Sequence, residues 1–182
     1  LKVGAYGLLR IAYPIFPEAA IELSSVVAFV GVLSIIYAAL NALAAKDLKR
    51  LIAYSSIAHI GLMCAAIFSM NDIGLKGVMI QMFNHGVNVI GLWIVANAIE
   101  TQLGTRKFSE LGGLAGKAPA LAILLVVMAL ANIALPLTNG FVGEFMLFNG
   151  LFIGDGSVAH IATMVFAGLG VILGAVYTLN MV

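Results

Sequence analysis

The sequence predicts an all-α fold, a polytopic bundle of transmembrane helices in which one helix is broken. Of the 182 residues, 63% are hydrophobic and 9% are charged, whereas soluble domains are about 45–50% apolar and about 25% charged. Long uncharged stretches recur along the chain, and one of them, residues 118–154, is too long for a single span. These observations exclude a soluble enzyme and make the placement of the few charges informative.

A membrane-spanning helix needs about 20 apolar residues, because each residue adds about 1.5 Å and the hydrocarbon core is about 30 Å thick. Residues 1–13 are too few, and Pro14 and Pro17 follow them, so we expect the end of a span that reaches the water interface. Because the first residue is Leu, we expect a fragment of a longer chain. Full spans of a single membrane domain are predicted at residues 23–45, 51–71, 77–99 and 157–182.

The stretch of residues 118–154 is predicted to be a discontinuous helix. As one straight helix it would be roughly 55 Å long, yet two spans and a turn need more than about 40 residues. Pro136 marks the break, since proline lacks a donor and clashes with the preceding turn, and Thr138 and Asn139 can satisfy the freed backbone groups. We expect pieces near 118–134 and 140–154, with a simple proline kink as the alternative.

Basic residues indicate the orientation of the chain in the membrane. Positive charge alternates between the loops, and the two basic loops contain Lys46, Lys49 and Arg50, and Arg106, Lys107 and Lys117. By the positive-inside rule, these two loops face the cytoplasm or its equivalent.

Four ionisable residues are predicted to lie at membrane depth, where an ionisable group costs roughly 2.5–3.5 kcal/mol and needs a reason to be present. By helical rise, Lys2 lies near the middle of its span, and His59 and His85 lie about 12 Å into theirs. Glu144 follows the predicted break and has apolar sequence on both sides. Burial shifts lysine and glutamate toward neutrality, and histidine exchanges protons near pH 7. These four residues therefore predict a proton path.

Polar neighbours support this interpretation. Ser55 and Ser56 precede His59, and Asn84 and Asn88 flank His85, so each imidazole is expected to have polar groups on its interior side. Taken singly, each histidine has a plainer interpretation as a hydrogen-bonded core residue, and Lys2 one as a chain-end lysine that reaches solvent.

Other classes of site receive no support from the sequence. A net charge of +1 provides no basic surface for nucleic acid. The single cysteine, Cys64, lies in an apolar run and excludes a disulfide framework or cysteine metal cluster. We therefore expect no metal and no cofactor on this chain.

The segment KDLKRLIAYSSIAHIG, residues 46–61, resembles the signature of the antiporter-like membrane subunits of NADH:quinone oxidoreductase (respiratory complex I), multisubunit cation/proton antiporters and membrane-bound hydrogenases. The resemblance continues through LKVGAYGLLR at the start, QMFNHGVNVIGLW at 81–93 and LANIALPLTNGFVGEF at 130–145. Most such subunits carry lysine where this chain has Glu144, and one type carries glutamate in a GEF context. Another type tends to have lysine four residues after the histidine that matches His85, where this chain has Val89. Both positions favour the glutamate type.

The resemblance implies about fourteen spans in two inverted five-helix repeats, each with one broken helix, of which this fragment holds the second repeat. It also implies roles for the buried residues. Lys2 matches the central lysine, His59 and His85 match two bridging histidines, and Glu144 matches the terminal acidic residue of the outward half-channel. The residues of the first half-channel are absent from this sequence.

The functional hypothesis is a proton-translocating subunit of NADH:quinone oxidoreductase, an enzyme whose NADH, FMN, iron–sulfur clusters and quinone are bound by other subunits. The expected partners are neighbouring antiporter-like subunits and the lipid bilayer, with no nucleic acid. The expected location is the bacterial cytoplasmic membrane or, alternatively, the mitochondrial inner membrane. A cation/proton antiporter subunit, a hydrogenase subunit and a non-conducting structural piece are the alternatives, although a spacer has no evident reason to bear four buried titratable groups.

Overall fold

The computed structural model describes residues 2–153 and 156–182, and over these residues the secondary structure is helical apart from one isolated bridge between Asp47 and Lys107. The all-α fold class is confirmed. The elements are α1 (Lys2–Gly7), the π-helical turn η1 (Leu8–Ala12), α2 (Tyr13–Ile15), α3 (Pro17–Glu22), α4 (Ser24–Leu43), α5 (Leu48–Ile67), α6 (Asp72–Leu103), α7 (Leu114–Lys117), α8 (Pro119–Asn132), α9 (Asn139–Phe152) and α10 (Val158–Leu179).

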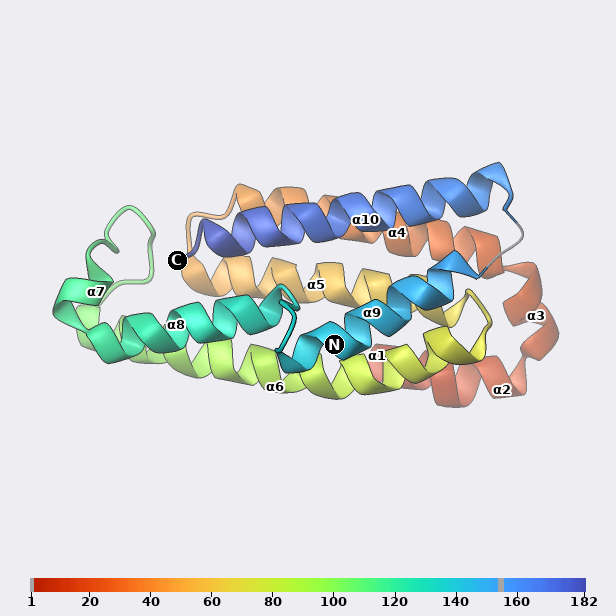
Figure 1. Ribbon diagram of the computed structural model, residues 1–182, viewed down its shortest axis with the longest axis horizontal. Coiled ribbons are helices and arrows are strands. Elements are labelled where there is room, and N and C mark those ends of the chain that lie inside the picture. Colours follow the sequence, from red (N-terminus) through yellow and green to blue (C-terminus); the bar gives the residue numbers. More distant parts are fainter. Residues whose placement is uncertain (1, 154–155) are drawn as a thin grey trace.

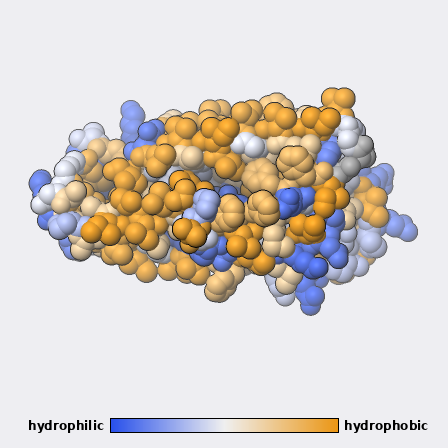
Figure 2. Space-filling view, viewed as in Figure 1, coloured by the Kyte–Doolittle hydropathy of each residue, from blue (hydrophilic) through white to orange (hydrophobic). Residues whose placement is uncertain are grey.

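The molecule is an elongated bundle whose long helices run side by side (Figure 1). Four helices, α4, α5, α6 and α10, are long and apolar enough to cross a membrane. Hydrophobic residues cover most of the face shown in Figure 2, and hydrophilic residues gather toward the two ends. This distribution is the one that a bilayer around the middle of the bundle requires.

Helix α6 is longer than the predicted span of 77–99, since it begins at Asp72 and ends at Leu103. Its ends are set by caps. Asn71 accepts a hydrogen bond from the backbone of Gly74 at 2.8 Å, and Gly104 ends the helix in the left-handed region at φ 72°. Counting apolar residues gives the part of a helix that lies in hydrocarbon, whereas capping residues give its full length.

The first segment also differs from the prediction of a helix that ends at Pro14. Helical structure continues through η1 and α2 to Ile15, and Pro14 follows directly on the π-helical turn, where the regular α-helical hydrogen bonding is already interrupted. The chain then bends at Phe16, and Pro17 begins α3. The proline that separates helices here is therefore Pro17.

The broken helix consists of α8 and α9, which lie end to end along α6 (Figure 1). Each half has 14 residues, about 21 Å, so neither crosses a bilayer alone. Between them the backbone turns through positive φ at Ala134 (52°) and Leu137 (81°), on either side of Pro136. The halves end two residues before the predicted 134 and begin one residue before the predicted 140, and the predicted end at residue 154 lies outside the described residues.

Helix α9 packs closely against α6, which positions the residues of the site. A Cβ atom on Gly150 would lie 2.4 Å from the Cα of Gly74, so the two backbones touch at this point. The side chain of Asn71 donates to the carbonyl of Gly150 at 2.7 Å and ties the start of α6 to the end of α9. Small residues that permit such approach are typical of helix contacts in membranes.

Candidate functional site

His59, His85 and Glu144 come together inside the bundle from three helices, α5, α6 and α9. Nδ1 of His59 lies 3.1 Å from Oε1 of Glu144. The rings of His59 and His85 have centroids 4.7 Å apart and are inclined by 43°. His85 is 1% exposed and Glu144 is 6% exposed. The three groups form an unbroken series of contacts in an apolar interior.

Lys2 approaches this series from α1. The helix contacts both α5 and α6, which carry His59 and His85. Lys2 itself is half-buried. No direct hydrogen bond between Lys2 and either histidine is found over residues 2–153 and 156–182, so a proton passing between them requires an intervening group such as water.

Gln81 is a member of the site that the sequence interpretation missed. Its Nε2 donates to Oε1 of Glu144 at 3.3 Å, and the side chain is 3% exposed. Gln81 precedes His85 by four residues and therefore lies on the same face of α6. That spacing is the signal that points to it, whereas a search limited to ionisable residues passes over a neutral amide.

Gly143 holds Gln81 close to Glu144. A Cβ atom at Gly143 would lie 2.2 Å from Oε1 of Gln81 and 3.1 Å from its Cα atom. Any side chain at this position would push α6 and α9 apart. The glycine therefore sets the distance between the amide and the carboxylate.

The four predicted polar neighbours of the histidines make their hydrogen bonds elsewhere. Ser55 Oγ accepts from Asn132, and Ser56 donates to the carbonyl of Ile52 at 3.1 Å. Over the described residues, none of the hydrogen bonds of Ser55, Ser56, Asn84 or Asn88 reaches an imidazole. Ser55, Ser56 and Asn88 are nevertheless buried. Helical spacing fixes a shared face, but it does not fix the direction of each hydrogen bond.

Instead, the two asparagines hold the broken helix against α6. Nδ2 of Asn88 donates to the carbonyl of Ala131 at 2.9 Å. Nδ2 of Asn84 donates to the carbonyl of Asn139 at 2.6 Å, and the Asn139 amide donates back to the carbonyl of Asn84 at 3.4 Å. Thr138 donates to the carbonyl of Leu135 at 2.7 Å, one of the backbone groups that the break releases.

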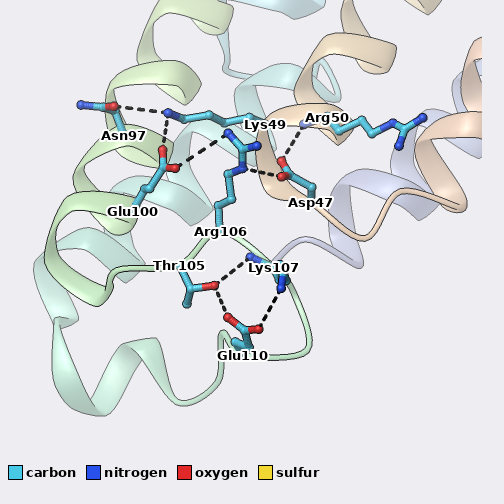
Figure 3. Close-up of polar contacts among 9 residues, drawn as sticks. All are labelled: Asp47, Lys49, Arg50, Asn97, Glu100, Thr105, Arg106, Lys107 and Glu110. Atoms are coloured by element: carbon cyan, nitrogen blue, oxygen red, sulfur yellow. Dashed lines mark hydrogen bonds and ion pairs between the residues drawn. The ribbon is translucent and has the colours of Figure 1, made fainter.

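A second polar cluster lies at the end of the bundle that contains the two basic loops (Figure 3). Asp47 caps α5 by accepting from the backbone of Arg50 at 3.1 Å, and its carboxylate pairs with Nε of Arg106 at 2.5 Å. Arg106 also lies 3.8 Å from Glu100, which pairs with Lys49. Both loops meet here, as the predicted orientation requires.

The loop after α6 has its own polar contacts (Figure 3). The Thr105 hydroxyl donates to Glu110, and Lys107 lies 3.3 Å from the same carboxylate. The Thr105 hydrogen bond, followed by the hydrogen bond and charge of Lys107, holds the pKa of Glu110 below its ordinary value. The backbone of this loop pairs with the start of α5, since Phe108 donates to Lys46 and Leu48 donates to Arg106.

No group of three or more His, Cys, Asp or Glu side chains suited to a metal ion is found in the part of the chain that the structure describes. The buried site holds two imidazoles and a carboxylate in series, side chains that can exchange protons.

Comparison with known proteins decides the family. Residues 1–176 match the family model described as the transmembrane region of NADH:quinone oxidoreductase and Mrp antiporters. The chain belongs to this family. It is 42% identical to NADH-quinone oxidoreductase subunit M of Rickettsia prowazekii, with all of this chain and 36% of that protein aligned. It is 38% identical to subunit M of Escherichia coli, with all of this chain and 35% of that protein aligned.

Solved structures of the family are also similar to this chain. Respiratory complex I from Thermus thermophilus with bound NADH matches with a TM-score of 0.92 and 33% identity, over 99% of this chain and 38% of that one. The Mrp complex from Dietzia sp. matches with a TM-score of 0.77 and 26% identity, over 83% of this chain and 17% of that one. The chain spans about a third of the length of its curated relatives.

The glutamate type that the sequence predicts is subunit M, and this prediction is confirmed, because the relatives at about 40% identity are named subunit M. These relatives are bacterial, and with four apolar helices the chain is a multi-pass protein of the bacterial inner membrane. Of the two expected locations, the bacterial one is confirmed.

Proposed function

We propose that this chain is part of subunit M of a proton-pumping NADH:quinone oxidoreductase and conducts protons through Lys2, His85, His59 and Glu144. The observation that carries the proposal is the buried series in which the rings of His85 and His59 lie 4.7 Å apart and Nδ1 of His59 lies 3.1 Å from Glu144. A structural spacer has no need of such a series, because each ionisable group is costly at membrane depth.

Each member of the series has a distinct part in the transfer. An imidazole accepts a proton on one nitrogen and releases one from the other, so the histidines relay protons without changing position. Lys2 supplies protons to the histidines through bridging water. Glu144 receives them from His59 and releases them to the outer side, while Gln81 donates to the carboxylate when it is ionised.

The energy required is within reach of modest electrostatic changes. Moving one charge against 100 mV costs about 2.3 kcal/mol, and one pKa unit corresponds to about 1.4 kcal/mol. A change of roughly two pKa units at one group is therefore sufficient. Quinone reduction elsewhere in the complex supplies this change through coupled charges along the membrane arm.

This function places the redox chemistry on other subunits. NADH, FMN, iron–sulfur clusters and quinone are held there, and this chain carries none of them. Its partners are the neighbouring antiporter-like subunits and the surrounding lipid. The apolar surface of the four spanning helices suits both kinds of contact.

The deciding experiment introduces Glu144→Gln and, separately, Lys2→Ala into the complete enzyme and measures protons pumped per NADH oxidised. Both variants are expected to lose most pumping while the complex still assembles. Glu18→Gln and Lys76→Ala are matched controls, because both residues are exposed and lie outside the series. Normal pumping in assembled Glu144→Gln and Lys2→Ala enzymes would overturn the proposal.

A cation/proton antiporter subunit is the second candidate, favoured by the structural match to the Mrp complex. Such a protein exchanges sodium for protons without NADH. Vesicles containing the complete complex distinguish the two candidates: proton uptake driven by a sodium gradient alone supports the antiporter, and uptake that requires NADH and quinone supports the oxidoreductase. A membrane-bound hydrogenase would require neither sodium nor NADH.

A further inference from the structure

A small cavity lies beside Glu144, and Gln81 is not among the residues that line it. Its volume is ≈ 30 Å³, enough for one or two water molecules, since a single water needs at least about 10–15 Å³. Residues from α4, α5, α8, α9 and α10 line it, and the polar members of the lining are His59, Asn132, Glu144 and Tyr177. Asn132 and Tyr177 have no part in the series of proton-carrying groups.

Asn132 and Tyr177 are held in place by a shared partner, Ser55. Nδ2 of Asn132 donates to Oγ of Ser55 at 3.0 Å, and the Tyr177 hydroxyl donates to the same oxygen at 3.3 Å. All three side chains are more than nine-tenths buried. The Nδ2 atom of Asn132 is used in the bond to Ser55. Its Oδ1 atom is a buried acceptor without a hydrogen-bond partner among the described residues. Leaving such a group unsatisfied costs about 1–3 kcal/mol.

Glu144 presents a second acceptor to the same cavity. Its Oε1 atom takes both contacts made by the carboxylate, from His59 and from Gln81. Over residues 2–153 and 156–182, Oε2 takes part in none of the hydrogen bonds or ion pairs. Asn132 and Glu144 both line this cavity, and each has an acceptor oxygen without a partner among the described residues, so a small molecule with two donors would satisfy both. Water meets this requirement, because it donates two hydrogen bonds.

We propose that this cavity is a water-binding site, in which one water donates to Oδ1 of Asn132 and to Glu144, and that Asn132 and Tyr177 thereby set the proton affinity of Glu144. The inference rests on the proposed function for its biological meaning. Asn132 and Tyr177 act as positioning residues, since they reach Glu144 through the water. Asn132 is also the last residue of α8, and Glu144 is in α9, so the site lies between the two halves of the broken helix.

The site acts alongside the other groups that surround Glu144. His59 on α5 faces the carboxylate, the ring of His85 on α6 lies against that of His59, Lys2 is on α1, which contacts α5 and α6, and Tyr177 lies on α10. Helix α8 contains no titratable side chain. A water that donates to the ionised carboxylate favours that form, so losing the water makes Glu144 bind its proton more tightly.

Infrared spectroscopy of the complete complex tests the proposal. The carboxyl band of Glu144 is identified by its absence in Glu144→Gln and is then titrated with pH. Asn132→Leu keeps the size of the side chain and removes the acceptor, so we expect roughly tenfold tighter proton binding at Glu144. Tyr177→Phe removes only the hydroxyl that holds Ser55, and we expect a smaller change in the same direction.

The control is Thr178→Val, because Thr178 is 0% exposed, lies next to Tyr177 and does not line the cavity. It is expected to leave the titration unchanged. A water O–H band that shifts in H₂¹⁸O should be present in this control and absent from Asn132→Leu. Titrations that match the control in both test variants, or a water band retained in Asn132→Leu, would overturn the proposal. If Asn132→Leu does not assemble, Tyr177→Phe decides alone.

These outcomes are independent of the proposed function. If Glu144→Gln pumps normally while the Asn132 and Tyr177 variants still shift the titration, the water site stands and the proton path through Glu144 fails. If Glu144→Gln abolishes pumping but the variants titrate like Thr178→Val, the path stands and the water site fails.

Discussion

At the scale of single residues, the charge of Glu144 is supported by two donors that differ in kind. His59 can give up its proton, whereas the Gln81 amide donates a hydrogen bond and keeps its proton at every physiological pH. In the proposed path, the amide therefore acts on the carboxylate through a hydrogen bond and carries no proton itself. This division explains why a neutral side chain occupies a buried position in a site otherwise built from titratable groups.

Gln81→Leu is expected to slow proton release from Glu144. A hydrogen bond to a charged group contributes about 1.5–3 kcal/mol, so losing it favours protonated Glu144 by tenfold or more. Pumping rate in the complete enzyme is the measurement, with Met79→Leu as the control, because Met79 lies on the same helix and is 59% exposed. Equal rates for the two variants would show that the amide does not act on Glu144.

Gly143→Ala is expected to destabilise the contact between α6 and α9. The added methyl group would lie 2.2 Å from Oε1 of Gln81 and 3.0 Å from its Cβ atom, and overpacking of this kind costs about 1–3 kcal/mol. Gly168→Ala is the matched control, since nothing lies within 4 Å of its position. The melting temperature of the assembled complex should fall for Gly143→Ala and stay unchanged for Gly168→Ala; equal melting temperatures would contradict the close packing.

At the scale of elements, the link between α8 and α9 is a strained turn held by its neighbours. Leu137 has φ 81°, a conformation that costs a non-glycine residue about 1–3 kcal/mol. Hydrogen bonds from Asn84, Asn88 and Thr138 hold the two half-helices around it. The break is therefore maintained by contacts with α6 as well as by Pro136.

Leu137→Gly is expected to be tolerated, whereas Leu137→Val is expected to lower the melting temperature of the complex. Glycine adopts positive φ freely, and a β-branched residue resists it strongly. Leu137 is fully exposed in this chain, so lost packing within the described bundle does not complicate the comparison. A lower melting temperature for Leu137→Gly than for Leu137→Val would show that backbone conformation is not the controlling factor.

The loop after α6 is expected to loosen in acid. Because the pKa of Glu110 is lowered, chiefly by the Thr105 hydroxyl and then by Lys107, its contribution to loop order is present above its ordinary value of 4.5 and is lost as pH falls through its lowered value. Hydrogen exchange over residues 104–113, corrected for intrinsic rates, should show reduced protection in acid. The Glu110→Gln variant should lose this pH dependence; if it keeps the dependence, another group is responsible.

At the scale of the whole molecule, features that depend on length and charge could be predicted from the sequence, and features that depend on pairing between helices could not. The length of residues 118–154 predicted a break, depth along each span selected His59 and His85, and the apolar sequence on both sides selected Glu144. Gln81 and Asn132 carry no charge, so their contacts became clear only when α8 and α9 were placed against α5 and α6. The hydrogen-bond partners of Ser55 and Asn88 could not be predicted, because they lie on other helices.

The orientation of the bundle decides which side Glu144 serves, and cysteine labelling tests it. The two basic loops meet at one end, where Asp47 pairs with Arg106. Loops rich in Lys and Arg stay on the cytoplasmic side of the membrane. With Cys64, the single cysteine of the chain, replaced by Ala, Lys107→Cys should react with a membrane-impermeant thiol reagent only in inside-out vesicles. Glu18→Cys, at the opposite end, should react only in right-side-out cells. The reverse pattern would place the end that contains Asp47 and Arg106 outside and make the Glu144 half of the proposed path an inlet.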